Sequence, residues 1–161
     1  MVATWSELCA DKQLRDLPYR IETNRQGQII MTPHKPIHSR YQSLINRLLD
    51  ERMSEGVTLV ECAIKTKDGT KVADVAWCSL DRWLRIKAEA EAPIAPEICV
   101  EVMSDANTEA EMAYKRTLYI EADAQEVWLV DSQGVVRFFD RTGELPASRL
   151  VEFPRRIDEV V

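Results

Sequence analysis

The sequence lacks several features that define whole classes of protein. Its four cysteines, Cys9, Cys62, Cys78 and Cys99, form no Cys-x-x-Cys pair, which argues against a structural zinc site or a thioredoxin-like redox motif. We expect them to be buried free thiols in a reducing cytoplasm. No apolar run approaches the roughly 20 residues that cross a bilayer, and the first residues show no basic start followed by an apolar stretch. We therefore expect a cytoplasmic protein with no membrane span, no secretory signal and no membrane partner.

Internal repeats, low-complexity tracts and linkers rich in proline, glycine and serine are also absent. We therefore expect residues 1–161 to form a single domain, and a chain of this size buries about 69% of its unfolded surface. Acidic residues outnumber basic ones by 27 to 21, which gives a net charge of −6 and a pI of about 5.1. This balance argues against a surface that is basic throughout, although it is compatible with a local basic face.

Two strands and a helix are predicted in the first third of the chain. Tyr19–Glu22 and Gln28–Thr32 have the pattern of a hairpin, and Gly27 supplies the positive φ that its turn requires. After Pro36, apolar residues recur every three or four positions, which predicts an amphipathic helix. Gly56 stands where the C-cap of this helix is expected.

The middle of the chain is predicted to form an antiparallel strand pair and a helix. Val57–Thr66 and Lys71–Cys78 are rich in β-forming residues and are joined by an Asp-Gly turn. The polar, alanine-rich segment Leu80–Glu91 follows, and Ser79 is a candidate for its N-cap. We expect this segment to be a helical insert.

The last part of the chain begins with a strand-like run, Pro96–Met103. Thr108 then opens a Thr-x-x-Glu capping box, which predicts a helix up to Glu121. Further strands are expected at Glu126–Val130, Val135–Phe139 and Arg149–Phe153. Without the insert, residues 36–131 read as helix, three strands, helix and strand. This order predicts an α/β fold with a mixed central sheet flanked by helices, to which the N-terminal hairpin is added.

Three carboxylates interrupt strand patterns that are otherwise apolar, namely Asp74, Glu101 and Glu61. Burying an unpaired carboxylate costs several kcal/mol, so each needs a cation, a metal or a shifted pKa. Two acids on neighbouring strands can share a divalent cation, and oxygen ligands suit Mg²⁺ or Mn²⁺. The alternative is that Asp74 lies on an edge strand and Glu101 pairs with a lysine across the sheet.

Lys115 is a candidate for the positive group near these acids. It lies four residues after Glu111 and four before Tyr119, so all three share one side of the predicted helix. The alternative is an ordinary Glu–Lys helix pair, worth a few tenths of a kcal/mol. Because the helix follows the strand that carries Glu101, its side chains can fold back over the end of that strand.

Several segments in a fixed order carry a resemblance to a known family. They are Gly27–Pro33, His38, Ala73–Val75, Pro96–Ser104, Lys115 with Tyr119, and Val127–Asp131. The set is similar to the PD-(D/E)xK nuclease superfamily, and it most closely resembles the Uma-type family of restriction-endonuclease-like proteins. The resemblance runs from about Tyr19 to Phe139 and implies a restriction-endonuclease-like core.

Two departures from the superfamily pattern stand out. Ala73 replaces the proline that precedes the first acid, which is conservative because that proline shapes the backbone. Met103 replaces the lysine of the motif. The resembled family commonly carries this lysine on the following helix, where Lys115 stands.

The resemblance implies Mg²⁺-dependent hydrolysis of phosphodiester bonds in DNA, with Mn²⁺ as the other candidate metal. Asp74 and Glu101 would hold the metal, and Lys115 would orient or help to deprotonate the attacking water. Glu22 and His38 are further candidates for the site. The alternative for His38 is a capping or surface residue at the start of a helix.

Acidic charge is the main objection to DNA as the substrate. Three local clusters of basic residues offset it: residues 34–47 (His34, Lys35, Arg40 and Arg47), residues 65–71 (Lys65, Lys67 and Lys71) and residues 82–87 (Arg82, Arg85 and Lys87). They are expected either to form a basic rim around the site or to be ordinary solvated residues. DNA binding is therefore expected to be weak and sensitive to salt.

A catalytically silent binding or scaffold module is the competing hypothesis, because fold does not guarantee function. In a nuclease, Asp74, Glu101 and Lys115 would meet within a few ångströms, whereas in a scaffold they would be scattered or blocked. A homodimer is expected under either hypothesis, with the hairpin that carries Phe138 and Phe139 as its packing surface.

Overall fold

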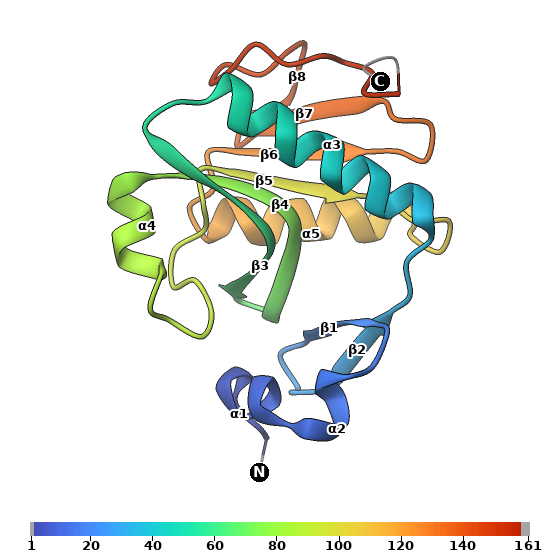
Figure 1. Cartoon of the computed structure of the whole chain (residues 1–161), viewed down its shortest axis with the longest axis vertical. Coiled ribbons are helices and arrows are strands. Elements are labelled where there is room, and N and C mark those ends of the chain that lie inside the picture. Colours follow the sequence, from blue (N-terminus) through green and yellow to red (C-terminus); the bar gives the residue numbers. More distant parts are fainter. Residues whose placement is uncertain (1, 159–161) are drawn as a thin grey trace.

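A six-stranded sheet runs through the middle of the computed structural model, which describes residues 2–158 (Figure 1). The strands lie in the order β3 (Gly56–Thr66), β4 (Gly69–Ser79), β5 (Ile98–Val102), β6 (Glu126–Val130), β7 (Val136–Asp140) and β8 (Gly143–Leu145). Only the pairing of β5 with β6 is parallel, and the other neighbours are antiparallel. The predicted α/β class with a mixed sheet is confirmed.

Helices cover both faces of this sheet, as predicted. In Figure 1, α3 (Pro36–Arg52) lies across one face and α5 (Glu109–Glu121) lies behind the other. A parallel strand pair needs a crossover connection, and α5 supplies it between β5 and β6. The short helix α4 (Leu80–Ile86) follows β4.

The N-terminal part forms a separate unit at one end of the molecule. It contains α1 (Trp5–Ala10), α2 (Lys12–Arg15) and a two-stranded hairpin of β1 (Arg20–Thr23) and β2 (Ile29–Thr32). The hairpin was predicted, but the two helices were not. Figure 1 shows the unit projecting below the sheet, next to the ends of β3 and β4.

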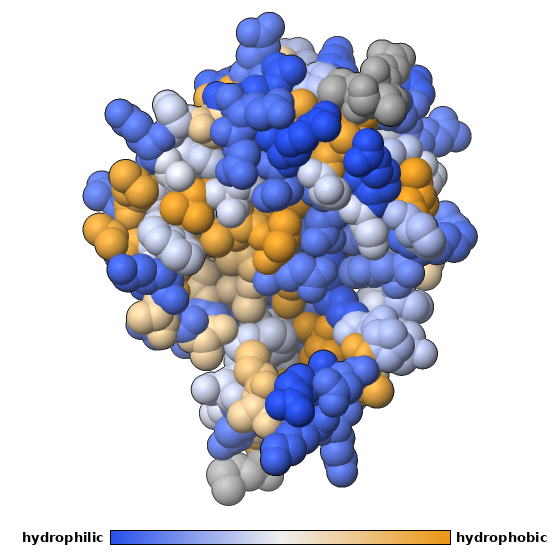
Figure 2. Space-filling model, in the orientation of Figure 1, coloured by the Kyte–Doolittle hydropathy of each residue, from blue (hydrophilic) through white to orange (hydrophobic). Residues whose placement is uncertain are grey.

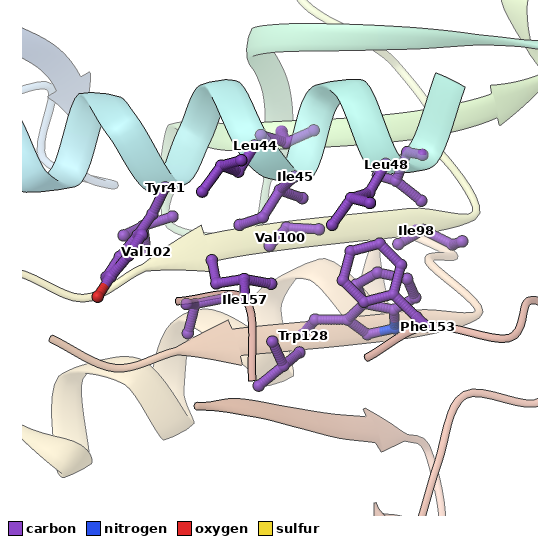
Figure 3. Packing of buried hydrophobic residues seen from close by; sticks show 14 of the residues in the cluster. Tyr41, Leu44, Ile45, Leu48, Ile98, Val100, Val102, Trp128, Phe153 and Ile157 are labelled. Carbon is purple, nitrogen blue, oxygen red and sulfur yellow. The ribbon is translucent and has the colours of Figure 1, made fainter. Parts of the chain in front are cut away.

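Each face of the sheet buries its own apolar core. Ile45 and Leu48 of α3 are buried against Val100 and Trp128 (Figure 3). On the other face, Tyr119 of α5 packs in a second cluster. The surface over α3 is mostly hydrophilic in Figure 2, as expected of an amphipathic helix that buries one stripe. Neighbouring residues of the central strands serve opposite cores because side chains alternate along a strand.

Gly56 does not cap the first long helix, contrary to the prediction. The helix ends at Arg52, and Met53 is its C-cap residue in an extended conformation. Gly56 instead begins β3, where a Cβ atom would collide with the indole of Trp77. This glycine is therefore required for close packing between neighbouring strands.

The helical insert is shorter than predicted. It ends at Ile86 rather than Glu91, although Ser79 caps it as expected by accepting the Arg82 N–H. After the helix the chain returns to β3, where the Ala92 N–H donates to the Ala63 carbonyl at 2.7 Å. This backbone pairing prevents the helix from continuing.

The predicted strand at Arg149–Phe153 is wrong, and the strand β8 was missed. The Arg149 N–H donates to the carboxylate of Glu126 at 2.7 Å rather than to a neighbouring strand. The ring of Phe153 packs on Trp128, with 4.6 Å between ring centroids. This segment therefore covers the α3 face of the sheet as irregular chain.

The hairpin phenylalanines do not form a packing surface for a second copy. Phe138 is 1% exposed and Phe139 is 2% exposed, and they lie in opposite cores. The strand that carries them is internal, between β6 and β8. The predicted basis for a homodimer is therefore wrong.

Three of the four cysteines are buried free thiols, as predicted, whereas Cys9 is exposed on α1. Burial raises the pKa of Cys62 to about 12 and that of Cys78 to about 11. Both thiols are therefore protonated and unreactive at neutral pH. Within residues 2–158, the helices are too short or too polar to cross a membrane.

Candidate active site

Asp74 and Glu101 lie where two central strands separate. The pairing of β4 with β5 extends only as far as Val75 and Val100, which are the immediate sequence neighbours of Asp74 and Glu101. Beyond it, the carboxylate of Asp74 accepts the N–H of Val102 at 2.6 Å. Asp74 is fully buried and Glu101 is 2% exposed. Because β4 lies between β3 and β5, the alternative that placed Asp74 on an edge strand is wrong.

The hairpin docks on the part of β4 that extends beyond β5. There, Glu22 of β1 accepts the N–H of Val72 at 2.6 Å, and Arg20 donates to the Val72 carbonyl at 3.4 Å. Lys71 is buried and donates to the Thr23 carbonyl at 2.8 Å. These contacts place the side chains of Arg20 and Glu22 beside the two strand acids.

Lys115 reaches the same place from α5. Its Nζ lies 2.7 Å from Oε2 of Glu22 and 3.0 Å from Oε1 of Glu101. It does not form the alternative helix pair with Glu111, whose N–H and carboxylate instead take part in the capping box at Thr108. Asp74, Glu101, Glu22 and Lys115, all candidates from the sequence, are therefore brought together in one region of the fold.

The neighbouring carboxylates of Glu101 and Glu22 keep Lys115 positively charged. Burial lowers its pKa, but the carboxylates of Glu101 and Glu22 outweigh burial and raise the pKa above the usual value. Burial raises the pKa of Glu22, and the charge and hydrogen bond of Lys115 reverse this to a lowered pKa. At neutral pH, Lys115 is a cation and Glu22 an anion. Lys115 can therefore donate hydrogen bonds but cannot take a proton from water.

Tyr119 fixes the orientation of Glu101. Its hydroxyl donates to Oε1 of Glu101 at 2.6 Å and is fully buried. Burial, followed by the negative charge of Glu101, raises the pKa of Tyr119 well above its usual value. The phenol therefore remains a hydrogen-bond donor.

His38 also reaches the site, so the alternative that placed it at the surface is wrong. Its side chain is 4% exposed, and Nε2 lies 3.3 Å from Oδ1 of Asp74. Burial and the neighbouring charges of His34 and Arg20 lower the pKa of His38 to about 4. The imidazole is therefore neutral at neutral pH and can donate one hydrogen bond to Asp74.

Arg20 is the functional candidate that the sequence reasoning missed. Its guanidinium contacts Oδ1 of Asp74 and lies 3.8 Å from Oε2 of Glu101, with only 6% of the side chain exposed. A signal for it existed, because strand alternation places Arg20 and Glu22 on the same face of β1.

Glu61 does not share the buried environment predicted for it. Its side chain is 48% exposed and lies 3.5 Å from the guanidinium of Arg20. β3 is the edge strand of the sheet, so its outer side chains meet solvent. Glu61 also has φ +54, a conformation that non-glycine residues rarely adopt.

Two hollows meet at the histidines. The inner one is polar, has a volume of about 30 Å³, and is lined by Glu22, Glu101 and Lys115 among others. The outer one has a volume of about 410 Å³ and a mostly apolar lining. His34 and His38 line both. The inner hollow has room for a water molecule or an ion, so a larger substrate must lie outside it.

The carboxylates fit a divalent cation. The guanidinium of Arg20 contacts Oδ1 of Asp74 and lies 3.8 Å from Oε2 of Glu101, so one cationic group already lies within reach of both acids. A cation at this place can therefore contact both acids, and oxygen donors suit Mg²⁺ or Mn²⁺.

His34, His38 and Asp74 form a second group with ligand atoms within 4.8 Å of one another. The two imidazole rings are stacked, with centroids 3.8 Å apart and planes 18° apart. Because a metal must lie in the plane of each imidazole that binds it, these rings cannot share one metal as they stand. The carboxylate pair is the better metal-binding candidate.

The predicted basic rim is partly used for structure. Arg82 donates to the carbonyls of Ala95 and Asp123 at 2.7 and 2.8 Å, and Lys35 pairs with Asp105. Burial lowers the pKa of His34, which makes it a poor source of positive charge. The exposed cluster members are Lys35, Arg40, Arg47, Lys65, Lys67, Arg85 and Lys87, of which Lys35, Arg47 and Lys67 pair with acids.

Comparison with known families and structures agrees with this architecture. Residues 10–159 match the family described as "Uma2: Putative restriction endonuclease". A crystal structure from Anabaena variabilis, described as "a putative nuclease belonging to DUF820", superimposes with a TM-score of 0.65 and 20% identity. The match covers 98% of this chain and 92% of that one, and at this identity it shows the fold. Among proteins with curated descriptions, none matches significantly.

Proposed function

Because the chain belongs to the Uma2 family, we propose that it is a divalent-metal-dependent nuclease that hydrolyses phosphodiester bonds in DNA. One observation carries the proposal. Glu101 of β5 and Lys115 of α5 line one small polar hollow, and Asp74 of β4 lies next to it, in contact with its lining residues Arg20 and His38. Two carboxylates that can hold a divalent ion, with a lysine beside one of them, suit metal-assisted hydrolysis of a phosphodiester.

Asp74 and Glu101 are the proposed metal ligands, and Mg²⁺ or Mn²⁺ is the proposed ion. When bound there, the ion would polarise the scissile phosphate and lower the pKa of a coordinated water. Two hydrogen bonds within the protein hold these ligands in position. The N–H of Val102 fixes Asp74, and the hydroxyl of Tyr119 fixes Glu101.

Lys115 is proposed to stabilise charge rather than to act as a base. Its raised pKa keeps the ammonium group charged, so it can donate to the attacking water and to phosphate oxygens that gain charge in the transition state. Glu22 lies 2.7 Å from this ammonium and holds it against Glu101. Glu22 is therefore a positioning residue in the proposal.

His38 is proposed to be a second positioning residue. Neutral imidazole can donate from Nε2 to Oδ1 of Asp74, 3.3 Å away, without adding positive charge beside the metal site. This contact would fix the orientation of the carboxylate before a metal binds.

DNA is the proposed substrate, held outside the inner hollow. The hollow of about 410 Å³ opens beside His34 and His38 and is the nearest space for a nucleotide. The net charge of −6 leaves few free cations for phosphates, so binding is expected to be weak and to fall steeply with salt.

A cleavage assay tests the proposal. Plasmid and single-stranded DNA are incubated with Mg²⁺ or Mn²⁺ and the wild-type protein, Asp74→Asn or Lys115→Ala. The matched controls are Asp81→Asn and Lys12→Ala, which change exposed residues elsewhere. We expect metal-dependent cutting by the wild type and both controls, and its loss in the two site variants. Cutting that survives both site substitutions would refute the assigned residues.

A catalytically silent module is the second candidate. One observation favours it: the guanidinium of Arg20 occupies the space between the two proposed metal ligands. Absence of cutting on any DNA, together with no metal binding in calorimetry, would support this candidate over the nuclease.

A cytoplasmic homodimer completes the proposal. β2 is the outer strand of its two-stranded hairpin, and Ile29, Ile30 and Met31 on it are 38%, 41% and 45% exposed. An exposed apolar edge strand is a natural surface for pairing with a second copy. Light scattering of the wild type and of Ile30→Lys tests the dimer, and fractionation of cells tests the location. A monomeric wild type would exclude the dimer.

A further inference from the structure

The guanidinium of Arg20 occupies the place where a metal ion would have to bind. It contacts Oδ1 of Asp74 and lies 3.8 Å from Oε2 of Glu101. These are the two carboxylate oxygens that are not already held by the Val102 N–H or by Tyr119 and Lys115. A metal ion and the guanidinium therefore need the same oxygens.

The other cation of the site cannot take over from Arg20. Lys115 pairs with Glu22 and Glu101, and no contact joins it to Asp74 in the described part of the chain. His38 does lie beside Asp74, but its Nε2 is 3.3 Å from Oδ1, the oxygen that the guanidinium of Arg20 contacts more closely. Without a metal, Arg20 is the positive charge that compensates the buried Asp74, and an uncompensated carboxylate at that depth is strongly unfavourable.

Arg20 also has a second carboxylate within reach. Glu61 lies 3.5 Å from the guanidinium, on β3, where the register skips Glu61 and Asp74 between the pairs Val60–Val75 and Cys62–Ala73. Its side chain is half exposed, so it can accept a guanidinium without a large desolvation penalty. Its left-handed backbone, with φ +54, marks a local distortion of β3 at this point.

Space is available for the guanidinium on the Glu61 side. A hollow of about 500 Å³ lies between the N-terminal unit and the sheet, and both Arg20 and Glu61 line it. Its other walls include Leu14 of α2 and Trp83 of α4. Apolar side chains gather where the projecting N-terminal unit meets the body of the molecule (Figure 2).

We propose that Arg20 is a place-holding cation that a divalent metal ion must displace, and that Glu61 receives the guanidinium when it moves. The inference rests on the proposed metal site at Asp74 and Glu101. It adds that metal affinity is set by competition with a side chain of the N-terminal hairpin. The protein is thereby kept folded and its acids neutralised when the metal is scarce.

Calorimetric titration with Mn²⁺ tests the competition. Arg20→Met removes the charge but keeps the stem, and we expect it to bind Mn²⁺ at least about tenfold more tightly than the wild type, a difference of about 1.4 kcal/mol. Arg25→Met is the matched control, because Arg25 lies in the turn of the same hairpin and pairs with Asp68 away from the site. It should bind like the wild type. Equal or weaker binding by Arg20→Met would overturn the proposal.

Glu61→Gln tests where the guanidinium goes. We expect it to bind Mn²⁺ several-fold more weakly than the wild type, because the displaced Arg20 loses its second partner. In the Arg20→Met background the same substitution should have no effect. If Glu61→Gln weakens binding equally in both backgrounds, Glu61 is a metal ligand and the exchange is wrong.

Arg20→Lys keeps the experiment decisive if Arg20→Met does not fold. It retains the charge but lacks the fork that spans both carboxylates, so it should bind Mn²⁺ several-fold more tightly than the wild type. Unchanged affinity would overturn the exchange. If wild type and variants alike bind no Mn²⁺, the metal site fails and the exchange fails with it. If the wild type binds and cuts but removal of Arg20 does not raise affinity, only the exchange fails.

Discussion

Removing the charge of Lys115 is predicted to destabilise the protein strongly and in a pH-dependent way. Its ammonium lies 2.7 Å from Glu22 and 3.0 Å from Glu101, and its side chain is 11% exposed. Removing one partner of a buried ion pair leaves the other charge buried, which costs about 3–5 kcal/mol. We expect Lys115→Met to lose this amount of unfolding free energy at neutral pH, without divalent metal. Urea unfolding followed by circular dichroism measures it.

The pH dependence follows from the pKa of Glu22. In the wild type this pKa is lowered, so the stability it provides is present above the ordinary glutamate pKa and lost as pH falls through the lowered value. Without Lys115, burial still raises the pKa of Glu22 and only the Val72 N–H and the charge of Arg20 still lower it, so protonation relieves the variant at a higher pH than it reaches this carboxylate in the wild type. The raised pKa of Lys115 in the wild type adds no change here, because its contribution is lost only in alkali.

The difference in stability between wild type and Lys115→Met should therefore narrow as the pH falls from neutral into the acid range. Adding Glu22→Gln to the variant should recover about 1–3 kcal/mol, because the amide still accepts the Val72 N–H but carries no charge. Lys87→Met, at an exposed lysine, is the control and should change stability by less than about 0.5 kcal/mol. A gap that stays constant with pH, or a double variant no more stable than the single one, would refute the reasoning.

Three further substitutions or reactions test the fold. Gly56→Ala should destabilise by about 1–3 kcal/mol, because the added methyl collides with Trp77; urea unfolding measures this, and an unchanged midpoint would contradict the close packing. Phe153→Ala should cost about 3–5 kcal/mol by the same measurement, because the ring packs on Trp128, and a cost below about 1 kcal/mol would argue against a packed C-terminal segment. A thiol reagent should label Cys9 in the native protein and the other cysteines only on unfolding; rapid labelling of a second thiol, read by mass spectrometry, would contradict their burial.

The strand acids and Lys115 could be predicted because local patterns fix their surroundings. Asp74 and Glu101 stand in apolar runs of period two, where a carboxylate is unusual enough to mark a site. The helix that carries Lys115 follows the Glu101 strand after a short loop, so its first turns must lie near the end of that strand. Both inferences need only sequence neighbours and strand or helix geometry.

Arg20 and Glu61 could not be placed in the same way. Strand alternation places Arg20 on the same face as Glu22, but Arg20 reaches the site only because its hairpin docks on β4, where it contacts Val72, 52 residues later in the chain, and no local pattern predicts that docking. Glu61 has the same apolar neighbours as the buried acids, but its strand lies at the edge of the sheet. The order of strands in a sheet is a long-range property, so edge and internal strands look alike in sequence.

The predicted C-terminal strand failed for a related reason. Arg149–Phe153 has strand-like composition, but the carboxylate of Glu126 accepts its first N–H and the aromatic core captures Phe153. The Glu126 side chain accepts the backbone N–H that a neighbouring strand would otherwise bind. Tertiary contacts therefore decided the conformation of this segment.

The hydrogen bond between Asp74 and the Val102 N–H gives this acid a structural role that would outlast a loss of cleavage in related chains. The carboxylate replaces a backbone carbonyl at the point where β4 and β5 part, so it closes the sheet as well as serving the proposed metal. A descendant that abandoned cleavage would still need an acceptor at this position, and Asp or Asn would persist there. Loss of Lys115 or Glu101 would be the earlier mark of an inactive member. An acid kept only at the position of Asp74 is therefore evidence for the fold and not for nuclease activity.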